Sequence, residues 1–199
     1  MKTQILTIAA VLTLALSTSK TTYASTVKVN ASTELADVKH ISKIELRGNV
    51  ELYVSNGTAE NVKVYNRYYA ESALVQNQNG TLRISSYKAE KLVVWVTASD
   101  LRNITAYDNS SIKSFGDLTG IELEVNLYNH ASADLKMNAY SANINVNDFA
   151  TANLAGNVTD CNLNYNQAAT VNSTKFTTDK MVRTVNNYTF SKAEQLTGL

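Results

Sequence analysis

The fold is decided by a pentad that occurs five times in the second half of the chain: Asp108-Asn109-Ser110-Ser111-Ile112, Asn129-His130-Ala131-Ser132-Ala133, Asp148-Phe149-Ala150-Thr151-Ala152, Gln167-Ala168-Ala169-Thr170-Val171 and Asn186-Asn187-Tyr188-Thr189-Phe190. The first residues of successive pentads are 21, 19, 19 and 19 positions apart. An apolar residue stands four positions before each start, so a unit of about twenty residues repeats. A repeat of that length is typical of a solenoid, in which each unit forms one coil.

The residues before each pentad predict one strand per unit. The positions four and two residues before the pentad are mostly apolar, and the position between them is always polar, as in a strand with one buried and one solvated face. The two inward columns are Ile104, Val125, Ile144, Leu163 and Val182, and Ala106, Leu127, Val146, Tyr165 and Thr184; the outward column is Thr105, Asn126, Asn145, Asn164 and Arg183. Stacked coils would place the Asn amides one rung apart, where they can hydrogen-bond in a ladder.

The sequence therefore predicts an all-β fold, a parallel β-helix-like solenoid with about 19–21 residues per coil. Residues 101–190 supply five repeats, and small residues at the third and fourth pentad positions allow a tight bend. A leucine-rich repeat has a similar length, and Val125-Asn126-Leu127 resembles its strand. The Asn that follows the second apolar position comes one residue too early, however, and no helical return segment follows, so the β-solenoid is favoured.

The first half, residues 25–100, reads as short strands and hairpins that pack on the solenoid or complete it. Apolar and polar residues alternate with period two, as in Leu92-Val93-Val94-Trp95-Val96. Gly48-Asn49, Asn56-Gly57 and Asn79-Gly80 fall between such runs, where a tight turn needs a positive φ. Residues 68–78 fit either a strand carrying Leu74 and Val75 or one turn of helix.

Residues 1–24 read as a signal peptide. Lys2 precedes an apolar run from Ile5 to Leu16, and Thr22-Tyr23-Ala24 offers small residues for cleavage before Ser25. A membrane anchor is the alternative, but the run is shorter than the roughly 20 residues that a spanning helix needs. We therefore expect an exported protein, periplasmic, secreted or at the cell surface, with no integral membrane span after signal removal. Residues 25–199 would form one domain, with 191–199 as a cap or tail that covers the last rung.

Composition excludes some functions. Lys and Arg number 18 against 17 Asp and Glu, without a basic cluster, so we expect no nucleic-acid partner. Cys161 is the only cysteine and lies in a strand-like alternation, which favours a buried, inert thiol over a catalytic one. No nucleophile elbow, phosphate loop or His cluster is present. We expect no catalytic residues, no metal and no cofactor.

The order of the segments resembles the head GIN family of adhesin-type domains, a family without an established molecular function that is common in secreted proteins of Bacteroidetes-type bacteria. The resemblance covers residue 37 to about residue 190. It rests on strands such as Val50-Glu51-Leu52-Tyr53-Val54 and Asn79-Gly80-Thr81-Leu82-Arg83-Ile84, which precede the repeats. The family repeats commonly read Gly-Ser-Gly and then an aliphatic residue, whereas Ser110-Ser111-Ile112 and Ala131-Ser132-Ala133 keep only the Ser. The resemblance implies a β-helix-like solenoid without catalytic residues.

One candidate ligand site emerges. Tyr107 and Tyr128 precede adjacent pentads and should stack, and Asn129 lies beside them. Such a tyrosine ladder with an amide suits a glycan, since sugars pair apolar faces with rings and hydroxyls with amides. Packing of this stripe against the N-terminal strands is the alternative. Trp95 is a further candidate, in a cleft between the strand half and the repeats.

Three functions remain open. The first is a non-enzymatic, adhesin-head-like interaction module that binds a glycan, a lipid or another surface protein, with homo-oligomers by edge or lateral packing as a further option. The second is a periplasmic or surface protein that binds a small glycan or lipid. The third is a polysaccharide-active solenoid enzyme, which needs converging carboxylates beside a base. The Asp residues available for Ca²⁺ occupy different columns, so we expect them to stay apart; they are Asp108, Asp134, Asp148 and Asp160.

Overall fold

The computed structural model describes residues 32–35, 38, 40–65 and 73–186, and in these ranges the chain forms thirteen strands and no helix. Their bounds are Ser32–Glu34 (β1), Lys43–Gly48 (β2), Val50–Asn56 (β3), Asn61–Tyr65 (β4), Ala73–Gln78 (β5), Thr81–Ser86 (β6), Leu92–Ala98 (β7), Asn103–Ala106 (β8), Ser111–Ser114 (β9), Leu118–Leu127 (β10), Ser132–Val146 (β11), Thr151–Asn166 (β12) and Thr170–Asn186 (β13). The all-β prediction is confirmed. The described residues include no helix long and apolar enough to cross a membrane.

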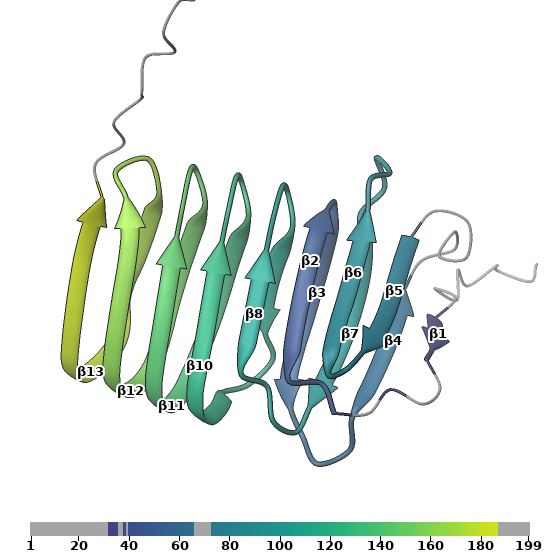
Figure 1. Ribbon diagram of the computed structural model, residues 1–199, viewed down its shortest axis with the longest axis horizontal. Helices are drawn as coiled ribbons and strands as arrows, with labels where there is room; N and C mark the ends of the chain where they lie inside the picture. The colour runs from purple at the N-terminus through teal and green to yellow at the C-terminus, as the bar shows by residue number, and fades with distance from the viewer. Residues whose placement is uncertain (1–31, 36–37, 39, 66–72, 187–199) are drawn as a thin grey trace, which may run out of the picture.

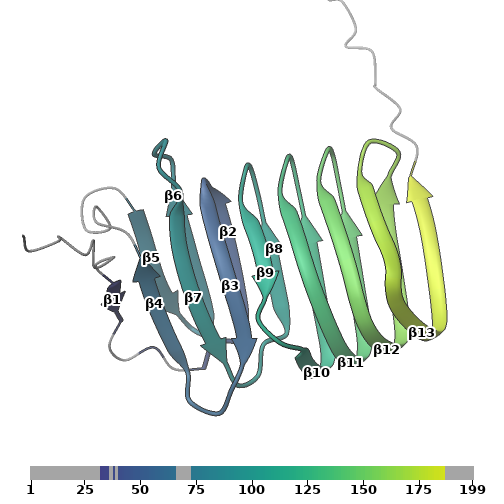
Figure 2. The same cartoon turned by 180° about the vertical axis from the view of Figure 1, so that it is seen from behind.

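The strands lie in two facing layers (Figure 1). The first layer has the order β5-β6-β2-β8-β10-β11-β12-β13, and the second layer, seen from behind in Figure 2, has the order β1-β4-β7-β3-β9-β11-β12-β13. The long strands β11, β12 and β13 bend and contribute to both layers. For this reason the layers are two parts of one hydrogen-bonded sheet.

Successive repeats pair in parallel and in register. Val125 of β10 stands opposite Ile104 of β8 on one side and Ile144 of β11 on the other, and Ile144 stands opposite Leu163 of β12. Each unit passes along the first layer, through the pentad turn, along the second layer and back. Residues 19–21 positions apart in the sequence therefore stand opposite each other on neighbouring strands.

The core lies between the layers and contains the predicted inward columns. Ile104, Val125, Ile144 and Leu163 have no exposed surface, and neither do Ala106, Leu127 and Val146. The small third pentad residues Ser110, Ala131 and Ala150 are also fully buried, which leaves no room for a larger side chain at the turn. Since burying one aliphatic side chain contributes about 1.5–3 kcal/mol, the stacked columns supply a large part of the folding free energy.

The first pentad residue adopts the left-handed conformation in three units. The φ angles are 61° at Asp108, 59° at Asn129 and 55° at Asp148, a region in which Asn and Asp are the least unfavourable residues after Gly. Each of these side chains also accepts a hydrogen bond from a backbone N–H of the preceding coil. Gly48 donates to Asp108 Oδ2 (2.9 Å), Asp108 to Asn129 Oδ1 (3.3 Å) and Asn129 to Asp148 Oδ2 (2.8 Å).

The fourth turn differs from the other three. Gln167 is not among the described residues with a positive φ, and Asn166 instead accepts hydrogen bonds at its Oδ1 from the backbone N–H of Ala168 (3.1 Å) and of Ala169 (2.9 Å). An amide one residue earlier therefore organises this turn. The first pentad residue is polar in every unit, but the turn is stabilised by that residue in the first three units and by the residue before it in the fourth.

The predicted Asn ladder is confirmed on the outer surface of the first layer. Asn145 Nδ2 donates to Asn126 Oδ1 (2.7 Å), and Asn164 Nδ2 donates to Asn145 Oδ1 (3.0 Å). Asn126 in turn donates to Glu124 Oε1 (2.9 Å), which ends the ladder on a carboxylate. The ladder uses the amides of this column to bind the coils to one another.

The first half forms additional coils and fewer hairpins than predicted. Asn79-Gly80 does join an antiparallel pair, β5 and β6, with φ angles of 50° and 77°. Gly48-Asn49 instead carries the chain from β2 in the first layer to β3 in the second, and these two strands pair with other partners. Asn56-Gly57 likewise joins strands that do not pair, and neither residue has a positive φ. The hairpin prediction is wrong at both places because β2 and β3 lie in different layers and β7 lies between β3 and β4.

The order of the coils in space differs from their order in sequence. The coil made by β2 and β3 lies between the later coil of β6 and β7 and the first repeat, β8 and β9. Antiparallel strands β5, β4 and β1 complete this end of the molecule. Residues 68–78 include β5, so their described part, 73–78, is a strand; residues 68–72 lie outside the described residues.

The columns predicted for the fifth unit are wrong by one residue. A bulge in β13, opposite Asn153 to Ala155, shifts the pairing, so that Leu163 stands opposite Arg183 and not opposite Val182. Val182 is consequently about half exposed, and Met181, opposite Cys161, packs against the core. Of the fifth pentad only Asn186 is described, and the predicted signal peptide (1–24) and tail (191–199) also lie outside the described residues.

Gly156 should be among the least replaceable residues of the fold. Its φ is 98°, and an added Cβ would lie 2.0 Å from the Met137 carbonyl oxygen. Gly116 has a similar φ of 85°, but an added Cβ would meet nothing within 4 Å. Replacing either Gly by Ala costs about 1–2 kcal/mol through φ alone. We expect Gly156→Ala to lower the free energy of unfolding by about 3 kcal/mol or more. Gly116→Ala should lower it only by the cost of the positive φ, about 1–2 kcal/mol. Urea unfolding measures both, and equal losses would contradict the steric argument.

Candidate functional site

The predicted tyrosine stack is present at the turn edge of the repeats. The ring centroids of Tyr107 and Tyr128 are 5.0 Å apart, with an interplanar angle of 10°. The Arg47 guanidinium from β2 lies 4.1 Å from the centroid of Tyr107, on the side opposite Tyr128, because β8 lies between β2 and β10. Both faces of the Tyr107 ring are therefore covered by protein groups.

The surroundings of this stack are those of a packing contact. Burial raises the pKa of the Tyr128 hydroxyl, and the neighbouring Tyr107 adds to the rise. Asn129 uses its side-chain oxygen to accept the backbone N–H of Asp108. The stack links the N-terminal coil to the repeats through Arg47, and a ligand-binding role for Tyr107, Tyr128 and Asn129 stays a prediction.

Trp95 lies elsewhere, on the outer surface of the second layer. Its ring stacks on Tyr53 of β3, with centroids 4.6 Å apart, and lies 5.5 Å from Phe115 and 6.5 Å from Tyr65. The four rings come from strands β3, β4 and β7 and from the end of β9. The structure therefore does not bring Trp95 together with the Tyr107–Tyr128 pair, and Trp95 belongs to a second aromatic cluster.

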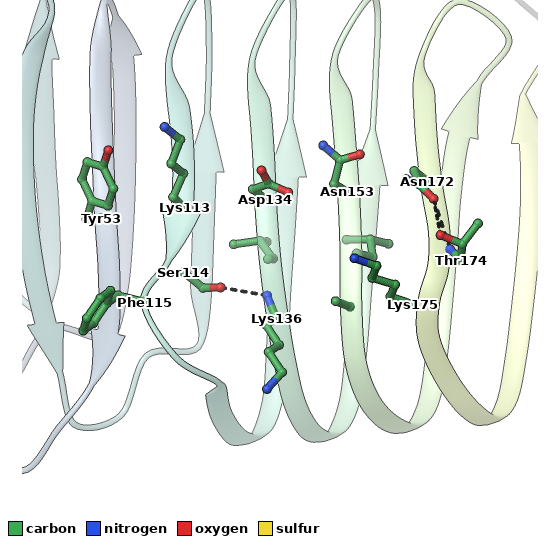
Figure 3. Close-up of a pocket in the computed structure, with 13 residues that line it drawn as sticks. Tyr53, Lys113, Ser114, Phe115, Asp134, Lys136, Asn153, Asn172, Thr174 and Lys175 are labelled. Carbon is green, nitrogen blue, oxygen red and sulfur yellow. Dashed lines mark hydrogen bonds between the residues drawn. The ribbon is translucent and has the colours of Figure 1, made fainter.

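A groove of about 500 Å³ begins at this cluster and crosses the second layer. Figure 3 shows its side chains in two rows over β3, β9, β11, β12 and β13. Tyr53 and Phe115 stand at one end, and Asn172, Thr174 and Lys175 stand at the other. The groove thus spans the junction between the first half and the repeats.

One row of the groove is a register column. Tyr53 stands opposite Lys113, Lys113 opposite Asp134, Asp134 opposite Asn153, and Asn153 opposite Asn172. Adjacent strands are about 4.8 Å apart, so the five side chains extend over about 19 Å. The backbone spacing places these groups at regular intervals along a straight line.

Ion pairs hold two of the lysines of the groove. Lys113 Nζ lies 2.6 Å from Glu51 Oε1, and Lys136 Nζ lies 2.6 Å from Asp117 Oδ1. The hydrogen bond from Lys113 lowers the pKa of the Glu51 carboxyl below its ordinary value of 4.5, and a hydrogen bond from the Tyr53 hydroxyl (3.0 Å) acts in the same direction. Lys113 Nζ also lies 5.4 Å from the centroid of the Tyr53 ring. This network fixes Tyr53 and Lys113 at the mouth of the groove.

The central polar groups of the groove are not used by the fold. None of the hydrogen bonds between described residues involves the side chain of Asp134 or Asn153. Asn172 uses only its Oδ1, which accepts from the backbone N–H and the hydroxyl of Thr174. These groups remain available to a ligand that carries both donors and acceptors.

The structure also places the single cysteine and the candidate metal ligands that the sequence offers. The Cys161 thiol is buried, and burial raises its pKa to about 11, which matches the predicted inert thiol. Within the described ranges no group of three or more His, Cys, Asp or Glu side chains could hold a metal ion. The groove lining includes one carboxylate, that of Asp134.

Sequence reasoning missed most of the groove, although a signal for it is present. Lys113, Asp134, Asn153 and Asn172 each stand five positions after the start of a pentad, and this column is polar in all four units. Periodicity therefore identifies the row. Tyr53 and Phe115 could not be added to it from the sequence, because the position of β3 beside β9 depends on the order of the coils.

The whole pattern can be compared with known proteins. Residues 40–192 match the model of the family described as "putative auto-transporter adhesin, head GIN domain". The chain belongs to this family. No curated protein matches this head GIN chain significantly.

Solved structures of similar fold are distant in sequence. A "putative adhesin" from Bacteroides fragilis has a TM-score of 0.71 at 14% identity. The aligned region covers 79% of this chain and 76% of the adhesin chain. A "putative adhesin" from Parabacteroides merdae has a TM-score of 0.63 at 13% identity, with 78% and 77% covered. A "putative lipid binding protein" from Parabacteroides distasonis has a TM-score of 0.58 at 9% identity, with 78% of each chain covered. At these identities the likeness concerns the fold alone.

The tyrosine stack should contribute to stability. Tyr107→Ala removes one ring pair and one cation–π contact, and we expect it to lower the free energy of unfolding by about 2 kcal/mol. Tyr140→Ala is the control, because Tyr140 is largely exposed and has no ring partner among the described residues; its effect should stay within about 0.5 kcal/mol. Thermal unfolding measures both. A Tyr107→Ala variant that is as stable as the parent but loses ligand binding would assign the stack to a binding site.

The Glu51–Lys113 pair should make stability depend on pH. Because the pKa of Glu51 is lowered in the folded state, its ionised form stabilises the fold above the unfolded pKa, and this contribution disappears as the pH falls through the folded pKa. We expect Glu51→Gln to be less stable than the parent at about pH 7 and the difference to shrink below about pH 4. Glu90→Gln is the control, since Glu90 is exposed and has no ion pair among the described residues. A difference that stays constant in urea unfolding across this range would contradict the assignment.

Proposed function

We propose that this head GIN domain is an exported, non-enzymatic interaction module of the adhesin type, built as a β-solenoid, that binds its partner through the groove across the second layer. The observation that carries the proposal is the groove itself, whose polar row is regular and whose central side chains, Asp134 and Asn153, make no hydrogen bond between described residues. The parallel pairing of residues 19–21 positions apart supports the solenoid class. The family membership supports the adhesin-type role.

An enzymatic role has less support at this site. Hydrolysis of a polysaccharide commonly uses two carboxylates on either side of the scissile bond. Asp134 is the one carboxylate that lines the groove, and its neighbours along the row are Lys113 and Asn153. A surface with rings at one end, amides at the other and paired lysines between them instead suits recognition without chemistry.

Export and location are part of the proposal. The apolar run within residues 1–24 and the adhesin-type family both favour a periplasmic, secreted or surface protein. A binding partner would then be a glycan, a lipid or another surface protein. A lipid is kept as an outcome of the test, because one similar fold is described as a "putative lipid binding protein".

The proposal predicts saturable binding that a change in the groove abolishes. The purified chain is tested on an array of neutral and acidic glycans and on vesicles of phosphatidylcholine and phosphatidylglycerol. Asn153→Phe fills the middle of the groove, whereas Asn162→Phe places the same side chain on the same strand but on the outer surface of the first layer. We expect binding to at least one surface, lost in Asn153→Phe and kept in Asn162→Phe.

Two results would contradict the proposed function. The first is the absence of binding to every glycan and vesicle by a chain that unfolds cooperatively. The second is equal loss of binding in Asn153→Phe and Asn162→Phe, which would show that the groove is not the binding surface.

A further inference from the structure

The outward polar side chains hydrogen-bond to one another in the first layer but not in the central row of the second layer. On the first layer, Asn126, Asn145 and Asn164 stand in register and hydrogen-bond to one another. On the second layer, Asn153 stands in register between Asp134 and Asn172, yet no hydrogen bond among described residues joins these three side chains. The second row therefore offers acceptors at Asp134, a donor and an acceptor at Asn153, and a donor at Asn172, whose Oδ1 is engaged by Thr174. Such groups match hydroxyls, which both donate and accept.

An exposed aromatic end accompanies the polar row. Phe115 is 66% exposed, and its backbone is fixed by a hydrogen bond from its N–H to the Val54 carbonyl (2.7 Å). Its ring is braced by Trp95, while Tyr53 stands beside it in the groove (Figure 3). An ordered, exposed ring next to a row of amides is a surface on which the apolar face of a sugar ring can pack.

The charges of the groove compensate one another. Lys113 is paired with Glu51 and Lys136 with Asp117, and the remaining lining charges, Lys175 and Asp134, have opposite signs. An acidic polysaccharide would find no group of unpaired cations here. The charge distribution favours an uncharged ligand over an acidic one.

We infer that the groove binds a linear, uncharged oligosaccharide that runs across the strands. One sugar ring packs against Phe115 and the edge of Tyr53, and successive units hydrogen-bond to Asp134, Asn153 and Asn172. The row extends over about 19 Å, the length of a short oligosaccharide. This inference rests on the proposed function, because it names the ligand of the same groove.

Trp95 provides a local reporter for the test. It is the only tryptophan of the chain, and its ring contacts both Tyr53 and Phe115 at the aromatic end of the groove. The intrinsic fluorescence of the chain is titrated with cellohexaose, chitohexaose and mannohexaose, each of which is linear and uncharged. Hexagalacturonate and phosphatidylglycerol vesicles are the acidic and lipid probes. We expect a saturable change with at least one of the neutral hexasaccharides and none with the acidic or lipid probes.

Two pairs of matched variants locate the binding. Phe115→Ala should weaken binding about tenfold, the effect of losing one ring contact of typical size, and Phe149→Ala, at a residue 64% exposed that stacks on His130 at the pentad turns, should leave it unchanged. Asn153→Ala should likewise weaken binding, and Asn162→Ala should not. Isothermal calorimetry is the second readout, because Phe115→Ala also alters the surroundings of Trp95.

The outcomes separate this inference from the proposed function. Binding of hexagalacturonate or vesicles alone overturns the uncharged sugar but leaves an interaction module that uses the groove. If a neutral hexasaccharide binds and Phe115→Ala and Phe149→Ala weaken that binding equally, the assigned site is wrong. Failure of every probe here and on the glycan array overturns both.

Discussion

The structure depends on the hydrogen bond with which three successive pentad turns bind the preceding coil. A carboxylate or amide on a left-handed residue accepts the backbone N–H of the coil before it, as Asp148 does from Asn129. A coil of about twenty residues cannot bury its apolar face alone, so its stability comes from contact with its neighbours. Since a shift of one residue would turn every buried side chain outward, a turn that fixes the register protects the whole core.

The architecture can be predicted from the sequence where every unit has the same length and the same pattern of buried residues. The inward columns could be predicted because Ile104, Val125 and Ile144 occupy equivalent places in coils of nearly equal length. The prediction is wrong where the rule is interrupted. The bulge in β13 adds one residue opposite Asn153 to Ala155, and a periodic pattern has no signal for a single added residue. The turn at Gly48 was predicted as a hairpin because glycine indicates a positive φ and does not indicate which strands pair.

The candidate site was less predictable than the fold because it depends on contacts between coils that are distant in the sequence. Its polar row could be read from the column that contains Asp134 and Asn153, since that column follows the repeat. Its aromatic end could not. Tyr53, Trp95 and Phe115 come from three coils that lie side by side only because the β2–β3 coil lies between β6–β7 and β8–β9. Neither the spacing of these aromatic residues nor their type indicates that arrangement.

The groups that hold the coils together are largely separate from the central polar groups of the groove. Side-chain hydrogen bonds join the coils at the pentad turns and along the Asn ladder of the first layer. On the second layer, Lys113 bonds to Glu51 and Ser114 Oγ accepts the backbone N–H of Lys136, whereas Asp134 and Asn153 make no side-chain hydrogen bond between described residues. Substitutions at Asp134 or Asn153 would change the groove without removing a described hydrogen bond between coils. The central groups of the groove can therefore change while the turns and the Asn ladder keep the register of the coils.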